Sequence, residues 1–135
     1  MGIAVVLTDE RGGVLERIAG PLHLTDELLC CADVPRSTCL RFIDPYGRTI
    51  FNAMQLPVLI EELEVLRRLV DPAACGALHQ RQIDFAGQFG ADIAAEAMKR
   101  PPAGAEHLRQ RADDIIALAR RGLETPHRYI TFIGD

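Results

Sequence analysis

The apolar residues of this chain change their spacing at Leu56, and that change limits the folds open to it. Before Leu56, short apolar runs alternate with turn residues, which is typical of strands. From Leu56 to Val70, apolar residues recur every three or four positions, as on the buried face of a helix. Because His127–Ile133 is again a strand-like run, the sequence predicts an α+β fold whose last strand returns to the sheet.

A first hairpin is predicted near the N-terminus. The apolar runs Ile3–Thr8 and Val14–Ile18 flank the turn residues Asp9–Gly13. No polar residue interrupts Ile3–Leu7, whereas a strand with one solvated face alternates apolar and polar residues. We therefore expect this strand to be central in the sheet or covered on both faces.

A second hairpin is predicted around the tetrapeptide Asp44-Pro45-Tyr46-Gly47. Asp at the first position, Pro at the second and Gly at the fourth are the residues that a type I turn prefers. The flanking segments Thr38–Ile43 and Arg48–Phe51 are expected to be its two strands.

Helical patterns are predicted on both sides of the second hairpin. We expect a short helical turn through Asp26–Cys31 with Thr25 as its N-cap, and longer helices over Leu56–Val70, Ala73–Arg100, where glycines interrupt the pattern, and Ala105–Arg121. The prediction is one α+β domain over residues 1–135, with an antiparallel sheet of about five strands and about three helices packed on one face. The Leu56–Val70 helix is expected to be the central one.

Charge and hydropathy favour a cytoplasmic protein that binds neither nucleic acid nor membrane. The chain has 15 basic and 19 acidic residues, a formal net charge of −4, and no basic run. Residues 1–64 hold ten acidic and five basic residues, so the excess of negative charge lies in the first half. No apolar stretch approaches the roughly 20 residues that cross a bilayer, and no export signal is recognised at the N-terminus.

The cysteines do not have the spacing of a metal site. Zinc sites use two cysteines separated by two to four residues, and no such pair is present among Cys30, Cys31, Cys39 and the neighbouring His23. We expect no metal and no cofactor. In a chain without an export signal, all four cysteines are expected to be free thiols.

No catalytic residues are assigned. Cys75 and His79 are spaced four apart on a predicted helix, where a buried thiol beside a surface histidine is the favoured interpretation. The carboxylate pairs are expected on solvent faces or turns, where no pKa is shifted for catalysis. These pairs are Asp9-Glu10, Glu61-Glu62 and Asp113-Asp114.

Two segments of the chain resemble a known group of proteins. CLRFIDPYGRTIFNAMQLPVLIEELEVL, residues 39–66, and YITFIGD, residues 129–135, are similar to small bacterial proteins of unassigned function with an I-D-P-[WY]-G-x-T-x-F-N hairpin. In size, acidity and α+β layout, such proteins are similar to immunity proteins of bacterial toxin systems. The resemblance implies that the partner is another protein, for instance a toxin encoded nearby.

Two functions of different classes are therefore expected. The first is a non-catalytic protein-interaction module of immunity type, and the alternative is a small enzyme or ligand-binding domain whose site is assembled from scattered residues. An acidic helix attracts a basic partner, and a Tyr beside an Arg at a turn is a typical anchor pair. Homo-oligomerisation is left open. The candidate partner-binding residues are Tyr46, Arg48, Glu61, Glu62 and Glu64.

Overall fold

The first strand lies in the middle of the only sheet in the part of the chain that the computed structural model describes, residues 2–135. All six of its residues are buried, so the prediction of a central strand is confirmed. The sheet is antiparallel, and it has four strands instead of about five. In the order β2-β1-β4-β3, the strands are β2 (Val14–Arg17), β1 (Ile3–Thr8), β4 (Tyr129–Gly134) and β3 (Arg48–Phe51).

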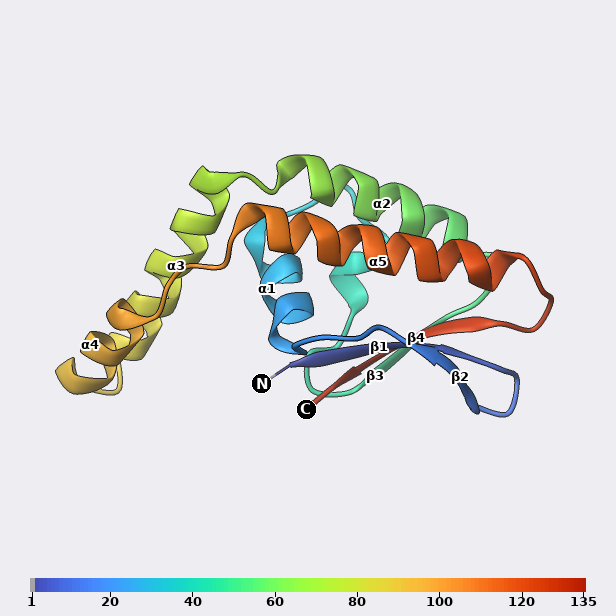
Figure 1. Ribbon diagram of the computed structural model, residues 1–135, viewed down its shortest axis with the longest axis horizontal. Coiled ribbons are helices and arrows are strands. Elements are labelled where there is room, and N and C mark those ends of the chain that lie inside the picture. The colour runs from blue at the N-terminus through green and yellow to red at the C-terminus, as the bar shows by residue number, and fades with distance from the viewer. Residues whose placement is uncertain (1) are drawn as a thin grey trace.

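The first hairpin and the return of the last strand are confirmed. β1 pairs with β2, and β4 lies between β1 and β3. Figure 1 shows both ends of the described chain at the same end of the sheet. The strands farthest apart in the sequence thus form the centre of the sheet.

The prediction of a second hairpin is wrong, although the predicted turn at residues 44–47 is confirmed. The Gly47 N–H donates to the Asp44 carbonyl, and the Asp44 side chain accepts from the Tyr46 N–H. Residues Leu40–Phe42, however, form a short 3₁₀ helix, η1, and β3 pairs with β4. A buried carboxylate binds the backbone N–H groups of residues 38–40, so these groups are not free to pair with a strand.

The described residues form five α-helices, where about three were expected. The predicted interruption of the Ala73–Arg100 helix is confirmed, because the helical conformation is interrupted around Gly90, whose φ is +128°. Thr25 is not an N-cap; it lies inside the first helix, where its buried hydroxyl has no hydrogen-bond partner among the described residues. The helices are α1 (His23–Cys31), α2 (Leu56–Leu69), α3 (Pro72–Gly87), α4 (Ala91–Lys99) and α5 (Ala105–Leu123).

The helix layer lies on one side of the sheet, as expected, but its central helix is α5 and not α2 (Figure 1). α5 contacts α1 on one side and α2 on the other, and it packs on β1 and β4. A Cβ on Gly122 of α5 would lie 3.1 Å from a methyl group of Leu56 and 3.2 Å from one of Leu7. The absence of a side chain at Gly122 therefore lets α5 approach both α2 and the sheet.

The helices α3 and α4 form an arm that projects from the rest of the molecule (Figure 1). Only Cys75 and Leu78, both in the first half of α3, are buried, and α4 has no buried residue. Asp71, which precedes Pro72 and is a residue type that favours this position, caps α3 by accepting a hydrogen bond from the Ala74 N–H at 2.7 Å.

Truncating a core residue of α2 tests this packing. Leu63 is fully buried, so Leu63→Ala is expected to lower the free energy of unfolding by about 2 to 5 kcal/mol. Leu69→Ala, on the same helix but partly exposed, is the control and should have a smaller effect. Equal losses of stability in denaturant titrations of the two variants would contradict the packing of α2.

Candidate functional site

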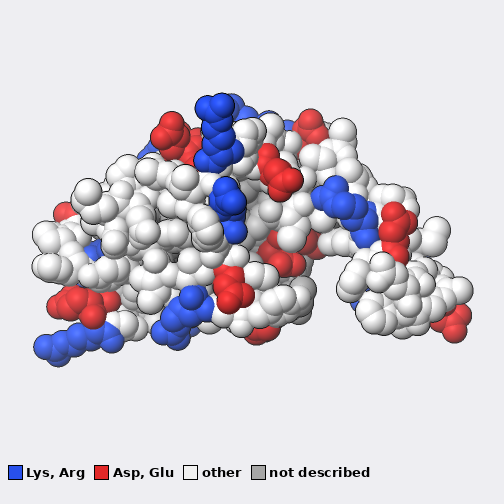
Figure 2. All heavy atoms as spheres, turned by 180° about the vertical axis from the view of Figure 1, so that it is seen from behind, with Lys and Arg blue, Asp and Glu red and all other residues white. Residues whose placement is uncertain are grey.

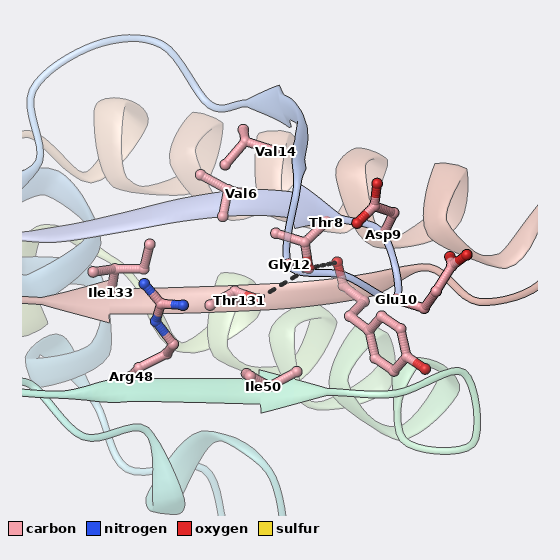
Figure 3. A pocket seen from close by; sticks show the side chains of 11 residues that line it. Val6, Thr8, Asp9, Glu10, Gly12, Val14, Arg48, Ile50, Thr131 and Ile133 are labelled. Carbon is pink, nitrogen blue, oxygen red and sulfur yellow. Dashed lines mark hydrogen bonds between the residues drawn. The ribbon is translucent and has the colours of Figure 1, made fainter.

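One face of the sheet is left uncovered by the helices. Ile3, Val5 and Leu7 of β1 belong to the core beneath the helix layer, and the alternating residues point the other way. Figure 3 shows this second face, with the strands in front and the helices behind them. Over the described part of the chain, no helix or strand packs against it.

A hollow of about 200 Å³ lies on the uncovered face. Besides Tyr129 and several polar residues, aliphatic side chains from all four strands line it, because the antiparallel register brings these strands side by side. Figure 3 shows these side chains around the hollow. They are Val6 of β1, Val14 of β2, Ile50 of β3 and Ile133 of β4.

Two buried hydroxyl groups line the hollow between these aliphatic side chains. Thr8 is 6% exposed and Thr131 is 2% exposed, and their Oγ1 atoms are 3.3 Å apart. The Thr8 hydroxyl can also donate to the Tyr129 carbonyl at 3.5 Å. The two hydroxyls therefore satisfy each other in surroundings where an unpaired polar group is costly.

The two ends of the hollow carry opposite charges. At one end the Arg48 guanidinium lies across β4 beside Ile133 (Figure 3). Within residues 2–135, no ion pair or side-chain hydrogen bond involves Arg48, although Arg67, for example, binds Asp113 at 2.6 Å. At the other end are two acidic residues, Asp9 and Glu10.

Asp9 holds the turn between β1 and β2. Its carboxylate accepts the backbone N–H of Gly13 at 2.8 Å and that of Arg11 at 2.9 Å. Since hydrogen bonds to the charged form favour it, they hold the pKa of Asp9 below its ordinary value, the bond from Gly13 most of all. Asp9 is therefore an anion at neutral pH.

The predicted partner-binding residues lie on two sides of the molecule. Tyr46 is 68% exposed in the turn before β3, and Arg48 follows it at the uncovered face. Glu61, Glu62 and Glu64 are on α2, in the helix layer on the opposite side of the sheet. The structure thus brings Tyr46 and Arg48 together and separates them from the three glutamates.

The acidic residues of α2 have different surroundings. Glu61 is exposed, while Glu64 binds Arg120 of α5 at 2.9 Å. Glu62 is 8% exposed, so the prediction that it lies on a solvent face is wrong. Its carboxylate is directed under the loop before η1, where it is bound by the chain itself.

Glu62 binds three consecutive backbone groups of that loop. The N–H groups of Thr38, Cys39 and Leu40 donate to its carboxylate at 3.0 to 3.1 Å, and the Thr38 hydroxyl donates at 3.1 Å. Burial raises the pKa of Glu62, but these hydrogen bonds outweigh burial and hold the pKa below its ordinary value. Glu62 is therefore a charged structural residue of the fold.

The cysteines are free thiols. Cys30 is exposed and Cys31, Cys39 and Cys75 are buried. Burial, and next the neighbouring Cys75, raise the pKa of Cys31 to about 11, so this thiol is protonated at neutral pH. Among residues 2–135, no three His, Cys, Asp or Glu side chains are grouped so that they could hold a metal ion. Over the same range, none of the helices combines the length and the apolarity required to span a membrane.

The fold and the site thus define an α+β protein with a four-stranded antiparallel sheet, one face of which is uncovered and hollowed. No protein family, no curated protein and no solved structure matches the chain.

The variant Glu62→Gln tests the role of the buried carboxylate. Hydrogen bonds to a charged group are stronger than those to a neutral one, so this variant should lose about 1 to 3 kcal/mol of stability at pH 7. Glu61→Gln, its exposed neighbour, is the control and should change little.

The effect of Glu62→Gln should depend on pH. Because the folded-state pKa of Glu62 is depressed, its stabilisation is fully present above the ordinary value of 4.5 and is lost as the pH falls through the folded-state pKa. The difference between wild type and variant, measured by urea denaturation, should shrink over this acidic range. A difference that is constant from pH 7 to pH 3 would contradict the assignment.

Proposed function

We propose that this protein is a non-catalytic interaction module that binds an extended segment of another protein along β3. The observation that carries the proposal is the free edge of the sheet at β3, next to the exposed Tyr46. An edge strand offers unpaired backbone groups to which a second chain can add a strand.

The register of β3 identifies the free backbone groups. The Gly134 N–H donates to the Gly47 carbonyl at 2.8 Å, and the pairing continues in the same register to Phe51. Residues 47, 49 and 51 therefore exchange hydrogen bonds with β4, because bonded and non-bonded pairs alternate in an antiparallel ladder. Arg48 and Ile50 direct their N–H and C=O groups away from the sheet.

The two edges of the sheet differ in their protection. At the β2 edge the pairing with β1 is irregular between Leu7 and Thr8, and such irregularities hinder the addition of a strand. Both edge strands lack Pro and Lys and expose an apolar side chain, Ile50 of β3 at 53% and Leu15 of β2 at 49%, but β3 pairs in regular register. This difference favours β3 as the edge that accepts a partner.

The three glutamates of α2 do not form a free acidic surface that could steer a basic partner. Glu62 is buried and Glu64 is paired with Arg120, which leaves Glu61 as the one of the three without a side-chain partner among residues 2–135. On the face that Figure 2 shows, acidic and basic side chains are interspersed among uncharged atoms. Binding through backbone hydrogen bonds at β3, with Tyr46 as an aromatic anchor, does not require a surface whose charges all have the same sign.

The resemblance to immunity proteins gives the partner to test first, the product of a neighbouring gene. Ile50→Lys places a charge at the β3 edge and should weaken binding of that protein by at least about tenfold, as loss of a central contact does. Leu15→Lys is the matched control, because Leu15 lies on the β2 edge and is 49% exposed. Equal affinities of the two variants would contradict binding at β3.

Hydrogen exchange supplies a second readout in the same complex. The amides of Arg48 and Ile50 should become protected when the partner binds, whereas the amide of Thr49 is already paired with β4 in the free protein. Unchanged exchange at Arg48 and Ile50 in a saturated complex would rule out strand addition.

A further inference from the structure

Arg48 places a cation at the hollow without an acidic partner in residues 2–135. A guanidinium group is planar and donates two parallel hydrogen bonds to a carboxylate, a geometry that an ammonium group does not offer. Figure 3 shows this group lying over β4 at the end of the hollow that Ile133 lines. The charge and the shape of this end are complementary to a carboxylate.

The middle of the hollow is suited to an apolar group. The exposed side chains of Val14 and Ile50 form aliphatic walls over the buried Val6, and the hydroxyls of Thr8 and Thr131 bind each other at 3.3 Å. Because these hydroxyls are already paired, an apolar group that covers them leaves no polar atom unsatisfied. Removal of apolar surface from water then favours binding.

The far end of the hollow is unfavourable for a second negative charge. Asp9 is held in its charged form by backbone N–H groups, and Glu10 lies beside it with its carboxylate 3.9 Å from Arg128. Within residues 2–135 the Asp9 carboxylate is bound by backbone N–H groups and by no side-chain cation, so a second carboxylate placed beside it would be repelled. A ligand with one carboxylate therefore fits, while a dicarboxylate does not.

The volume limits the size of the ligand. A hydrocarbon-lined cavity of about 150 Å³ holds a benzene ring, and sites for drug-sized ligands begin at about 300 Å³. The hollow measures about 200 Å³, between the two. A single ring or a chain of a few carbons, together with its carboxylate, is the largest group that it can enclose.

We infer that the hollow binds a small monocarboxylic acid, with the carboxylate on Arg48 and the apolar group between Val14 and Ile50. The carboxylate that binds Arg48 can belong to a free acid or to the chain terminus of the protein partner. The site lies on the face beside β3, but binding of a free acid does not require that partner.

Titration with benzoate and with hexanoate at fixed ionic strength tests the inference. Both acids should give saturable shifts of the amide resonances of Val6, Ile50 and Thr131 in NMR spectra, and benzamide, which has no charge, should bind more weakly. Arg48→Gln should weaken the binding of both acids by about tenfold or more.

Arg17→Gln is the matched control. Arg17 is exposed and lies opposite Val6 in the β1–β2 pairing, so it is on the same face of the sheet but does not line the hollow. This variant should bind both acids as the wild type does. The absence of saturable shifts with either acid, or equal affinities of the wild type and Arg48→Gln, would overturn the inference.

The two sources of the carboxylate are separated by repeating the titration on the complex with the protein partner. Shifts that persist assign the hollow to a free acid, and shifts that the partner abolishes assign it to a carboxylate of the partner; either result supports the site. If the protein complex forms and benzoate fails to bind the free protein, only this inference falls. If benzoate binds and no complex forms, only the proposed function falls.

Discussion

The central strand β1 is buried on both faces although helices cover only one of them, and the form of the candidate site depends on this constraint. On the helix side, α1 and α5 exclude water from β1. On the other side, Val6 and Thr8 are shielded by side chains of the neighbouring strands, which stand up from the sheet around them. Exposed side chains of the outer strands, such as Val14 and Ile50, therefore surround the buried residues of the central strand, and the hollow lies between them.

The Glu62 carboxylate links the helix layer to the exposed edge. It fixes the loop at Thr38–Leu40, and the Asp44 N–H, a few residues further on, donates to the side chain of Thr49 in β3. The loop that leads into β3 is thus held at both ends by polar contacts with other elements. A charged residue in the helix layer thereby helps to determine where the edge strand begins.

Much of the fold could be predicted because its signals are local. The uninterrupted apolar run of β1, the apolar spacing of α2 and the cap at Asp71 are each contained in a few consecutive residues. The 3₁₀ helix η1 could not be predicted, since the carboxylate that replaces strand pairing is 22 to 24 residues away. Of the residues that line the hollow, the sequence predicts a binding role for Arg48 alone. Thr8 and Thr131 are separated by 123 positions, and their single signal, a Thr inside an apolar strand, is common to most sheets.

The projecting arm formed by α3 and α4 is less stable against local unfolding than the sheet. α4 buries none of its side chains and packs on α3, so little free energy opposes its separation from the rest. The amides of α4 can therefore exchange with solvent through local opening, while those of β1 and β4 exchange only when the whole molecule unfolds. Insertions or deletions between α3 and α5 would accordingly leave the sheet and its hollow unchanged.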